Sequence, residues 1–243
     1  MSGPLDDILE LRPVGGRLSA QALSDLALAA GAHADGHLHL TDRAGLELRG
    51  VGIGADEELL EAIRSAGLRT QPSHTILVSA FTGRVGGQAD LWPVAEELDE
   101  LLKDANLARD VVVVLDDGRG DLVDTPQDLG VMAVDPDSAQ VRVGSDHWGE
   151  VLELIELPQV LHDLATRERP VGQQHARDLR TQVRSLPAPH GIIWQDDGRR
   201  LEHVKVPGGD LTHDLATQVL ARARQDVIVT PWRSLLLVDL EAP

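Results

Sequence analysis

The sequence predicts an α+β fold, in which a duplicated β-α-β-β half at each end of the chain flanks a central α/β segment. The string LTDRAGLELRGV at 40–51 returns as VTPWRSLLLVDL at 229–240, with one threonine and two leucines shared at equal spacing. A glycine pair precedes a helical pattern in both halves, at Gly15-Gly16 and at Gly208-Gly209. Short runs of β-branched residues between the copies predict the buried strands of a separate α/β part.

The first half combines a helical period with an alternating one. Leu23, Leu26 and Ala30 recur at helical spacing behind Ser19, which is a suitable N-cap residue, and Ala44-Gly45 separates two alternating runs. The pattern predicts a strand at 8–14, a helix at 18–32, a hairpin of strands at 37–41 and 46–51, and a helix at 56–66.

The second half repeats this order. It predicts a strand at 203–207, a helix at 213–224, and a hairpin of strands at 226–229 and 235–240. Internal repetition of β-α-β-β units predicts two ferredoxin-like halves that pair about a pseudo-twofold axis. We therefore divide the chain into a first half domain at 1–72, a central α/β domain at 73–187 and a second half domain at 188–243.

The central segment alternates short apolar runs with amphipathic ones. It predicts strands at 74–79 and 110–115, a helix at 91–105, a hairpin of 130–134 with 140–143, helices at 157–167 and 173–185, and a linker at 187–189. The run from Asp116 to Asp121, DDGRGD, is similar to a calcium loop in composition. It lacks the 12-residue pattern with a terminal glutamate, so a hairpin turn is the favoured interpretation.

Composition excludes several classes of function. A formal charge of −18 argues against nucleic-acid binding, and the scarcity of aromatic residues argues against base-stacking surfaces. No run approaches the roughly 18 to 20 apolar residues of a membrane helix, and the N-terminus is acidic, so we expect a cytoplasmic protein that does not bind membranes. The absence of cysteine excludes thiolate-held metals and clusters.

Four strings, in order, carry a resemblance: GHLHLTDRAGLELRGV, FTGRVGGQADLWPVAEELDELL, VVVVLDDGRGD and TPWRSLLLVDL. Together they resemble the nitrite and sulfite reductase superfamily, and most closely its precorrin-3B synthases of cobalamin biosynthesis. The resemblance implies a ferredoxin-like half, an α/β domain, a second ferredoxin-like half and a further α/β domain. We expect this chain to end after the third of these pieces.

The resemblance also implies cofactors. In the family, the fourth domain carries cysteines spaced C-x5-C and C-x3-C, which ligate a four-iron four-sulfur cluster bridged to siroheme. This chain has no cysteine, so we predict no iron-sulfur cluster on it and no autonomous redox activity. Siroheme is the cofactor that the resemblance leaves open.

Arginine is the residue type that the resemblance places against siroheme carboxylates. The resemblance implies that Arg43 is the principal ligand-binding residue and that Arg84 and Arg233 are further cavity residues. His74 and Asp110 lie in stretches where relatives carry basic residues, and lost cations predict weakened siroheme binding. The alternative is that these arginines are solvated or paired with nearby acids.

We assign no catalytic residue and no metal ligand. His37 and His39 alternate onto one face of a strand, as metal ligands can, but the spacing fixes no third ligand. Three hypotheses remain open. The chain binds a tetrapyrrole or small anion without redox chemistry, it is part of a split enzyme completed by a partner chain that carries the cluster domain, or it is an interaction scaffold that forms a homodimer.

Overall fold

The computed structural model describes residues 8–52, 56–107, 110–144, 146–167, 190–223 and 225–241. The chain divides into two compact units, of which unit 1 combines Met1–Pro72 with Ala188–Pro243 and unit 2 is Ser73–Pro187. The helix predicted at 173–185 and the linker predicted at 187–189 lie outside the described residues. Of the helices that are described, none is long and apolar enough to cross a membrane.

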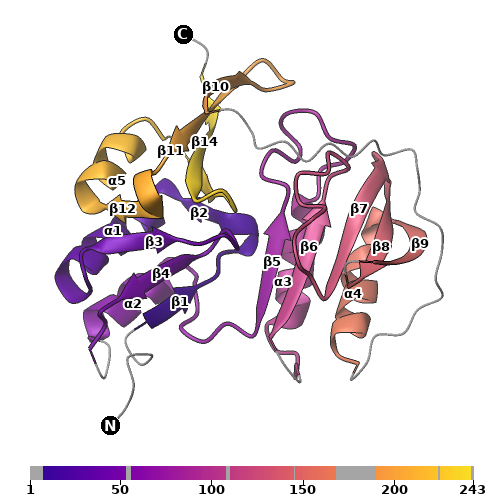
Figure 1. Cartoon of the computed structure of the whole chain (residues 1–243), viewed down its shortest axis with the longest axis horizontal. Coiled ribbons are helices and arrows are strands. Elements are labelled where there is room, and N and C mark those ends of the chain that lie inside the picture. The colour runs from indigo at the N-terminus through magenta and orange to yellow at the C-terminus, as the bar shows by residue number, and fades with distance from the viewer. Residues whose placement is uncertain are drawn as a thin grey trace. The chain divides into compact units, whose positions relative to one another are not determined.

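Unit 1 contains both repeats (Figure 1). The first contributes β1 (Ile8–Leu11), β2 (Arg17–Ser19), α1 (Ala20–His33), β3 (His37–Leu40), β4 (Leu46–Arg49) and α2 (Glu57–Ser65). The second contributes β10 (Gly191–Trp194), β11 (Arg200–Lys205), β12 (Asp210–Thr212), α5 (His213–Leu220), β13 (Asp226–Val229) and β14 (Ser234–Leu240). Every helix and strand predicted for the two halves is present, although α5 is shorter than expected.

The two halves exchange a short strand. β2 pairs with β13 of the second half, with Leu18 opposite Val227, and β12 pairs with β3 of the first half, with Leu211 opposite Leu38. The resulting sheets have the orders β1-β4-β3-β12 and β10-β11-β14-β13-β2. The β-α-β-β prediction was therefore incomplete, because it missed β2, β10 and β12 and treated each half as supplying all of its own strands.

One apolar core joins the halves. Leu23 and Leu26 of α1 and Leu235 and Leu237 of β14 are all fully buried in it, and α1 packs against α5. The predicted N-cap is confirmed, because the Ser19 hydroxyl accepts a hydrogen bond from the Ala22 N–H at 3.0 Å. A shared core with reciprocal strand pairing makes unit 1 one cooperative structure rather than two adjoining ones.

The glycine turns bring the two repeats into close contact. A Cβ on Gly16, whose φ is +77°, would lie 2.0 Å from the Val229 carbonyl oxygen and 3.1 Å from the Ala44 Cβ. A Cβ on Gly209, with φ +82°, would lie 3.2 Å from both the Leu40 carbonyl oxygen and the Arg233 Cβ. The ends of the two hairpins therefore meet over these turns, where positive φ and close contacts favour glycine.

The described residues of unit 2 form a five-stranded mixed sheet with two α-helices. Its elements are β5 (His74–Val78), α3 (Trp92–Leu102), β6 (Val111–Asp116), β7 (Leu129–Asp135), β8 (Ser138–Val143), β9 (His147–Glu153) and α4 (Leu157–Ala165). The strand order is β5-β6-β7-β8-β9, with β5 to β7 parallel and β7 to β9 antiparallel. Helices α3 and α4 pack against each other and against β5 and β7 (Figure 1).

One prediction for unit 2 was wrong, and one strand was missed. The segment after Asp116 is not a hairpin turn, because β6 and β7 are parallel and the chain must cross over between them. Strand β9 was not predicted at all, and its alternation is weak because its residues are exposed or only partly buried.

Candidate functional site

Arg43 lies at the end of the β3–β4 hairpin. The Thr41 N–H donates to the Gly45 carbonyl at 3.0 Å, and the Thr41 hydroxyl oxygen accepts from the Gly45 N–H at 3.0 Å and the Arg43 N–H at 3.3 Å. Ala44 takes a left-handed conformation, with φ 54°. These bonds fix the turn and leave the Arg43 side chain exposed beside the end of β1.

A cavity of about 260 Å³ lies beside this turn. Its lining residues are Glu10, Leu11, Arg12, Thr41, Asp42, Arg43, Gly45, Leu46 and Glu47. The two arginines differ, because the Arg12 guanidinium binds the Glu10 carboxylate at 2.6 Å whereas the Arg43 guanidinium has no ion-pair partner among the described residues. Of the two parts of the alternative, pairing of Arg43 with a nearby acid such as Asp42 is not seen among the described residues, whereas its exposed side chain is open to solvent.

Arg233 occupies a different position in its turn from Arg43. The Thr230 N–H donates to the Ser234 carbonyl at 2.9 Å, so Thr230 matches Thr41 and Ser234 matches Gly45. Arg233 has φ 53°, which makes it the equivalent of Ala44, and Trp232 is the equivalent of Arg43. The two arginines lie in neighbouring turns of unit 1, but Arg233 does not line the Arg43 cavity.

Arg84 belongs to unit 2, in the loop after the carboxyl end of β5. The Thr82 hydroxyl closes this loop by donating to the Ala89 carbonyl at 2.9 Å and accepting from the Leu91 N–H at 3.0 Å. Arg84 is partly buried there, and its N–H donates to the Phe81 carbonyl at 2.9 Å. Arg43 and Arg233 therefore share a unit, whereas Arg84 lies in the other.

Three carboxylates gather beside this loop, at the carboxyl ends of β5 and β6. Asp116, Asp117 and Asp121 each have a carboxylate oxygen within 4.8 Å of the others. Asp116 accepts backbone N–H bonds from Gly118 and Gly120, both at 2.9 Å, and the Ser79 hydroxyl donates to Asp121 at 2.6 Å. Asp117 binds the Arg119 guanidinium at 2.6 Å.

Burial perturbs all three carboxyl groups of this cluster. It raises the pKa of Asp116 and of Asp117, in the latter case against the opposing charge of Arg119. Burial also raises the pKa of Asp121 from 3.8 to about 7, and the charge of Asp116 adds to this effect. Asp121 therefore titrates near neutral pH.

The sequence analysis did not single out Arg12 or the perturbed carboxyls. Arg12 follows β1 directly, and the pairing of β1 with β4 brings it beside the Arg43 turn, which no local pattern shows. The DDGRGD run was visible, but its glycines and charges indicate an exposed turn, whereas the side chains of Asp116 and Asp117 are fully buried.

The comparisons with known proteins agree with this architecture. Residues 6–66 match the nitrite/sulfite reductase ferredoxin-like half domain. The chain is similar in structure to the NirA protein of Mycobacterium tuberculosis, with a TM-score of 0.74 and 15% identity over 96% of this chain and 54% of the NirA chain. It thus spans about half the length of NirA, and no curated protein matches it. The predicted α+β fold with ferredoxin-like halves is confirmed.

Proposed function

We propose that this chain, which carries a nitrite/sulfite reductase ferredoxin-like half domain, binds an anionic group at the Arg43 cavity without redox chemistry of its own. The group is a carboxylate of a tetrapyrrole or a small oxyanion. The observation that supports the proposal is the Arg43 guanidinium, which lines the cavity and has no ion-pair partner in the part of the chain that is described. A guanidinium remains charged and binds carboxylates and oxyanions through paired N–H donors.

The size and charge of the cavity limit the ligand. Pockets for drug-sized molecules occupy about 300 to 1,000 Å³, so a cavity of about 260 Å³ suits one carboxylate or a small oxyanion rather than a whole macrocycle. Three lining carboxylates, Glu10, Asp42 and Glu47, oppose an anion, and Arg12 is already paired with Glu10. Arg43 would therefore hold the end of a ligand whose remaining contacts lie elsewhere.

A thiolate-held iron-sulfur cluster does not fit this chain, because its 243 residues include no cysteine. Siroheme differs, because Arg43 suits one of its carboxylates. Within the proposal, the order of the four family-like strings favours a protein of the precorrin-3B synthase type that acts on or holds a tetrapyrrole. Electron transfer would then require a cluster from another polypeptide.

Ligand titration tests this proposal. Siroheme is added to the purified chain and followed by its visible absorbance, and sulfite binding is followed by calorimetry. Arg43→Gln should weaken binding of the bound anion about tenfold or more, because a charge-assisted contact contributes roughly 1.5 to 3 kcal/mol. Arg64→Gln is the matched control, since Arg64 is an exposed arginine of unit 1 paired with Glu57 and Glu61.

The outcomes separate the sources of the anion. Siroheme binding that depends on Arg43 supports the tetrapyrrole, and sulfite binding alone that depends on Arg43 supports a small oxyanion. Equal affinities of wild type, Arg43→Gln and Arg64→Gln, or no binding of either probe, contradict the proposal.

A second candidate function is that of a subunit completed by a partner chain. Strand β10 lies at an edge of its sheet, and its Ile192 and Trp194 side chains are 52% and 58% exposed. Exposed apolar residues on an edge strand favour association. Light scattering should then give the mass of a homodimer or of a complex with a cluster-bearing chain, and Trp194→Ser should restore the monomer. A monomer at all concentrations and in the presence of that chain contradicts this candidate.

A further inference from the structure

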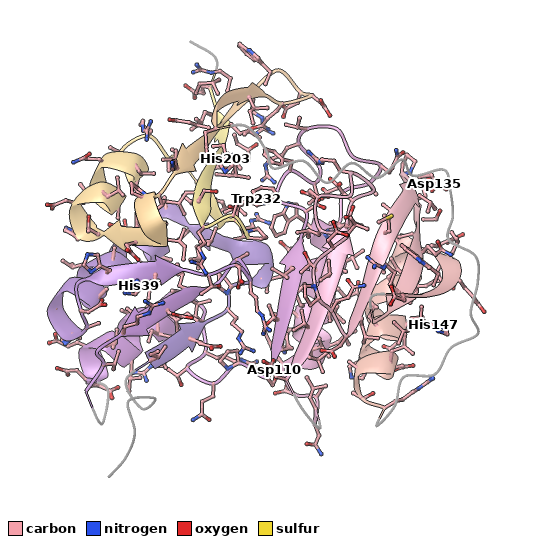
Figure 2. All side chains as sticks on the ribbon, viewed as in Figure 1. His39, Asp110, Asp135, His147, His203 and Trp232 are labelled. Carbon is pink, nitrogen blue, oxygen red and sulfur yellow. The ribbon has the colours of Figure 1, made fainter. Side chains whose placement is uncertain are left out.

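A second group of polar residues lies at the other end of β3 from Arg43. Asp35, His37 and His39 each have one ligand-type atom within 4.8 Å of the others. The His39 Nε2 lies 2.8 Å from an Asp35 carboxylate oxygen, and the His37 Nδ1 lies 3.8 Å from the other oxygen of Asp35. Figure 2 shows His39 on β3.

The alternation of β3 places these side chains together. His37 and His39 are two residues apart and share a face of the sheet, while Leu38 and Leu40 point into the core. The His37 N–H donates to Asp35 at 3.1 Å, which folds the Asp35 carboxylate back toward the start of the strand. The bend before the strand therefore supplies Asp35, the third ligand that spacing alone did not fix.

The exchanged strand of the other repeat adds a fourth residue. Asp210 of β12 lies directly opposite His39 in the sheet, and its carboxylate is 2.8 Å from the His39 Nδ1. An acceptor at Nδ1 favours a proton there, so Nε2 is the ring nitrogen that could bind a metal ion in place of its contact with Asp35. A carboxylate that orients the second nitrogen of a histidine in this way is characteristic of metal-binding histidines.

We propose that Asp35, His37 and His39 form a binding site for a divalent transition-metal ion, best suited to Zn²⁺, and that Asp210 orients His39 within it. Imidazole nitrogens and one carboxylate suit zinc, and three protein ligands leave a fourth position for water or a small ligand. Tetrahedral bonds of about 2.0 to 2.2 Å place the ligand atoms about 3.4 Å apart, so the His39–Asp35 pair at 2.8 Å must open and the His37–Asp35 pair at 3.8 Å must close, each by roughly half an ångström. The His37 and Asp35 side chains, 40% and 37% exposed, have the freedom to do so.

The proposal differs in a measurable way from a plain ion pair. Without a metal ion, His39 donates to both Asp35 and Asp210 only when both of its ring nitrogens carry protons. A metal ion would displace the proton from Nε2. The two cases are distinguished by metal binding itself, because an ion pair alone binds no metal.

Calorimetric titration with ZnCl₂ tests the site. Wild type should bind one zinc ion that His37→Ala and Asp35→Asn lose. Asp210→Asn should keep the stoichiometry and weaken affinity about 10- to 100-fold, as is typical when a partner of a ligating histidine is removed. Co²⁺ absorption in the visible range supplies an independent readout of nitrogen and oxygen ligation.

His162→Ala is the matched control. His162 is a histidine of α4 in unit 2, 3.3 Å from the Asp163 carboxylate, and should leave the zinc stoichiometry unchanged. Circular dichroism identifies any variant that fails to fold, and the exposed position of His37 makes it the decisive substitution. Unchanged zinc binding by His37→Ala and Asp35→Asn, or no binding by wild type below about 100 µM, overturns the proposal. Neither result bears on Arg43, whose variant tests a separate site.

Discussion

Asn in place of Asp121 should stabilise the protein at alkaline pH and have little effect in acid. Burial raises the pKa of Asp121 to about 7, against 3.8 for the exposed group. Between these values the folded chain holds a proton that the unfolded chain has released, so stability falls as the pH rises through this window. The penalty of the ionised carboxylate is complete above pH 7 and absent below about pH 4.

The magnitude follows from the size of the shift. A difference of about 3 pKa units corresponds to on the order of 4 kcal/mol. Asn keeps an oxygen that can accept the Ser79 hydroxyl bond of 2.6 Å. The second oxygen of Asp121 is buried without a hydrogen-bond partner among the described residues, and an amide N–H there would face the neighbouring carboxylates.

Urea denaturation at pH 8 and pH 4.5, followed by circular dichroism and tryptophan fluorescence, measures the effect. At pH 8, Asp121→Asn should raise the free energy of unfolding by about 1 to 4 kcal/mol. Most of this gain should vanish at pH 4.5. Asp124→Asn, an exposed aspartate three residues later, is the control and should change little. A gain that is equal at both pH values, or no gain at pH 8 over the control, would refute the reasoning.

Three further substitutions test the joint between the repeats by thermal or urea denaturation. Gly16→Ala should lower the free energy of unfolding by roughly 2 kcal/mol or more, because its Cβ would lie 2.0 Å from the Val229 carbonyl oxygen. Gly36→Ala is the control and should cost clearly less, because φ is also positive there but nothing lies within 4 Å of the added Cβ. Equal losses of stability would contradict the close-contact argument. Ser19→Ala should cost about 1 kcal/mol through loss of the N-cap bond, and no change would show that the cap is dispensable. Arg17→Gln, which removes a partly exposed ion pair, should cost under about 1 kcal/mol, and less still in high salt.

The elements of the two repeats could be predicted because each carries a periodic pattern long enough to recognise. Helix α1 has its Leu23, Leu26 and Ala30 stripe, and the predicted hairpins lie where the alternation of leucines places them. Strands β2 and β12 have three residues each, too few to show alternation. Their partners lie about 200 residues away, so the strand exchange has no local signature.

The candidate site residues also divide into those with a local sequence signal and those that depend on distant strand pairing. Arg43 could be selected from its turn and from the family resemblance, but the pairing of Arg12 with Glu10 depends on the registration of β1 with β4. Backbone hydrogen bonds were needed to show that Arg233 is equivalent to Ala44. The gap-free alignment placed an arginine near each turn but did not fix the position of that arginine within the turn. Asp210 could not be associated with His39 before β12 was known to pair with β3.

The reciprocal placement of β2 and β12 is the geometry of a domain-swapped dimer joined into a single polypeptide. Two copies of one ancestral module, trading a segment across their twofold axis, would have needed only gene duplication and fusion to reach it. The same geometry slows folding, because neither sheet of unit 1 is complete until strands roughly 170 to 210 residues apart in the sequence have paired. Separately expressed halves should therefore remain incomplete alone and recover their sheets only when mixed.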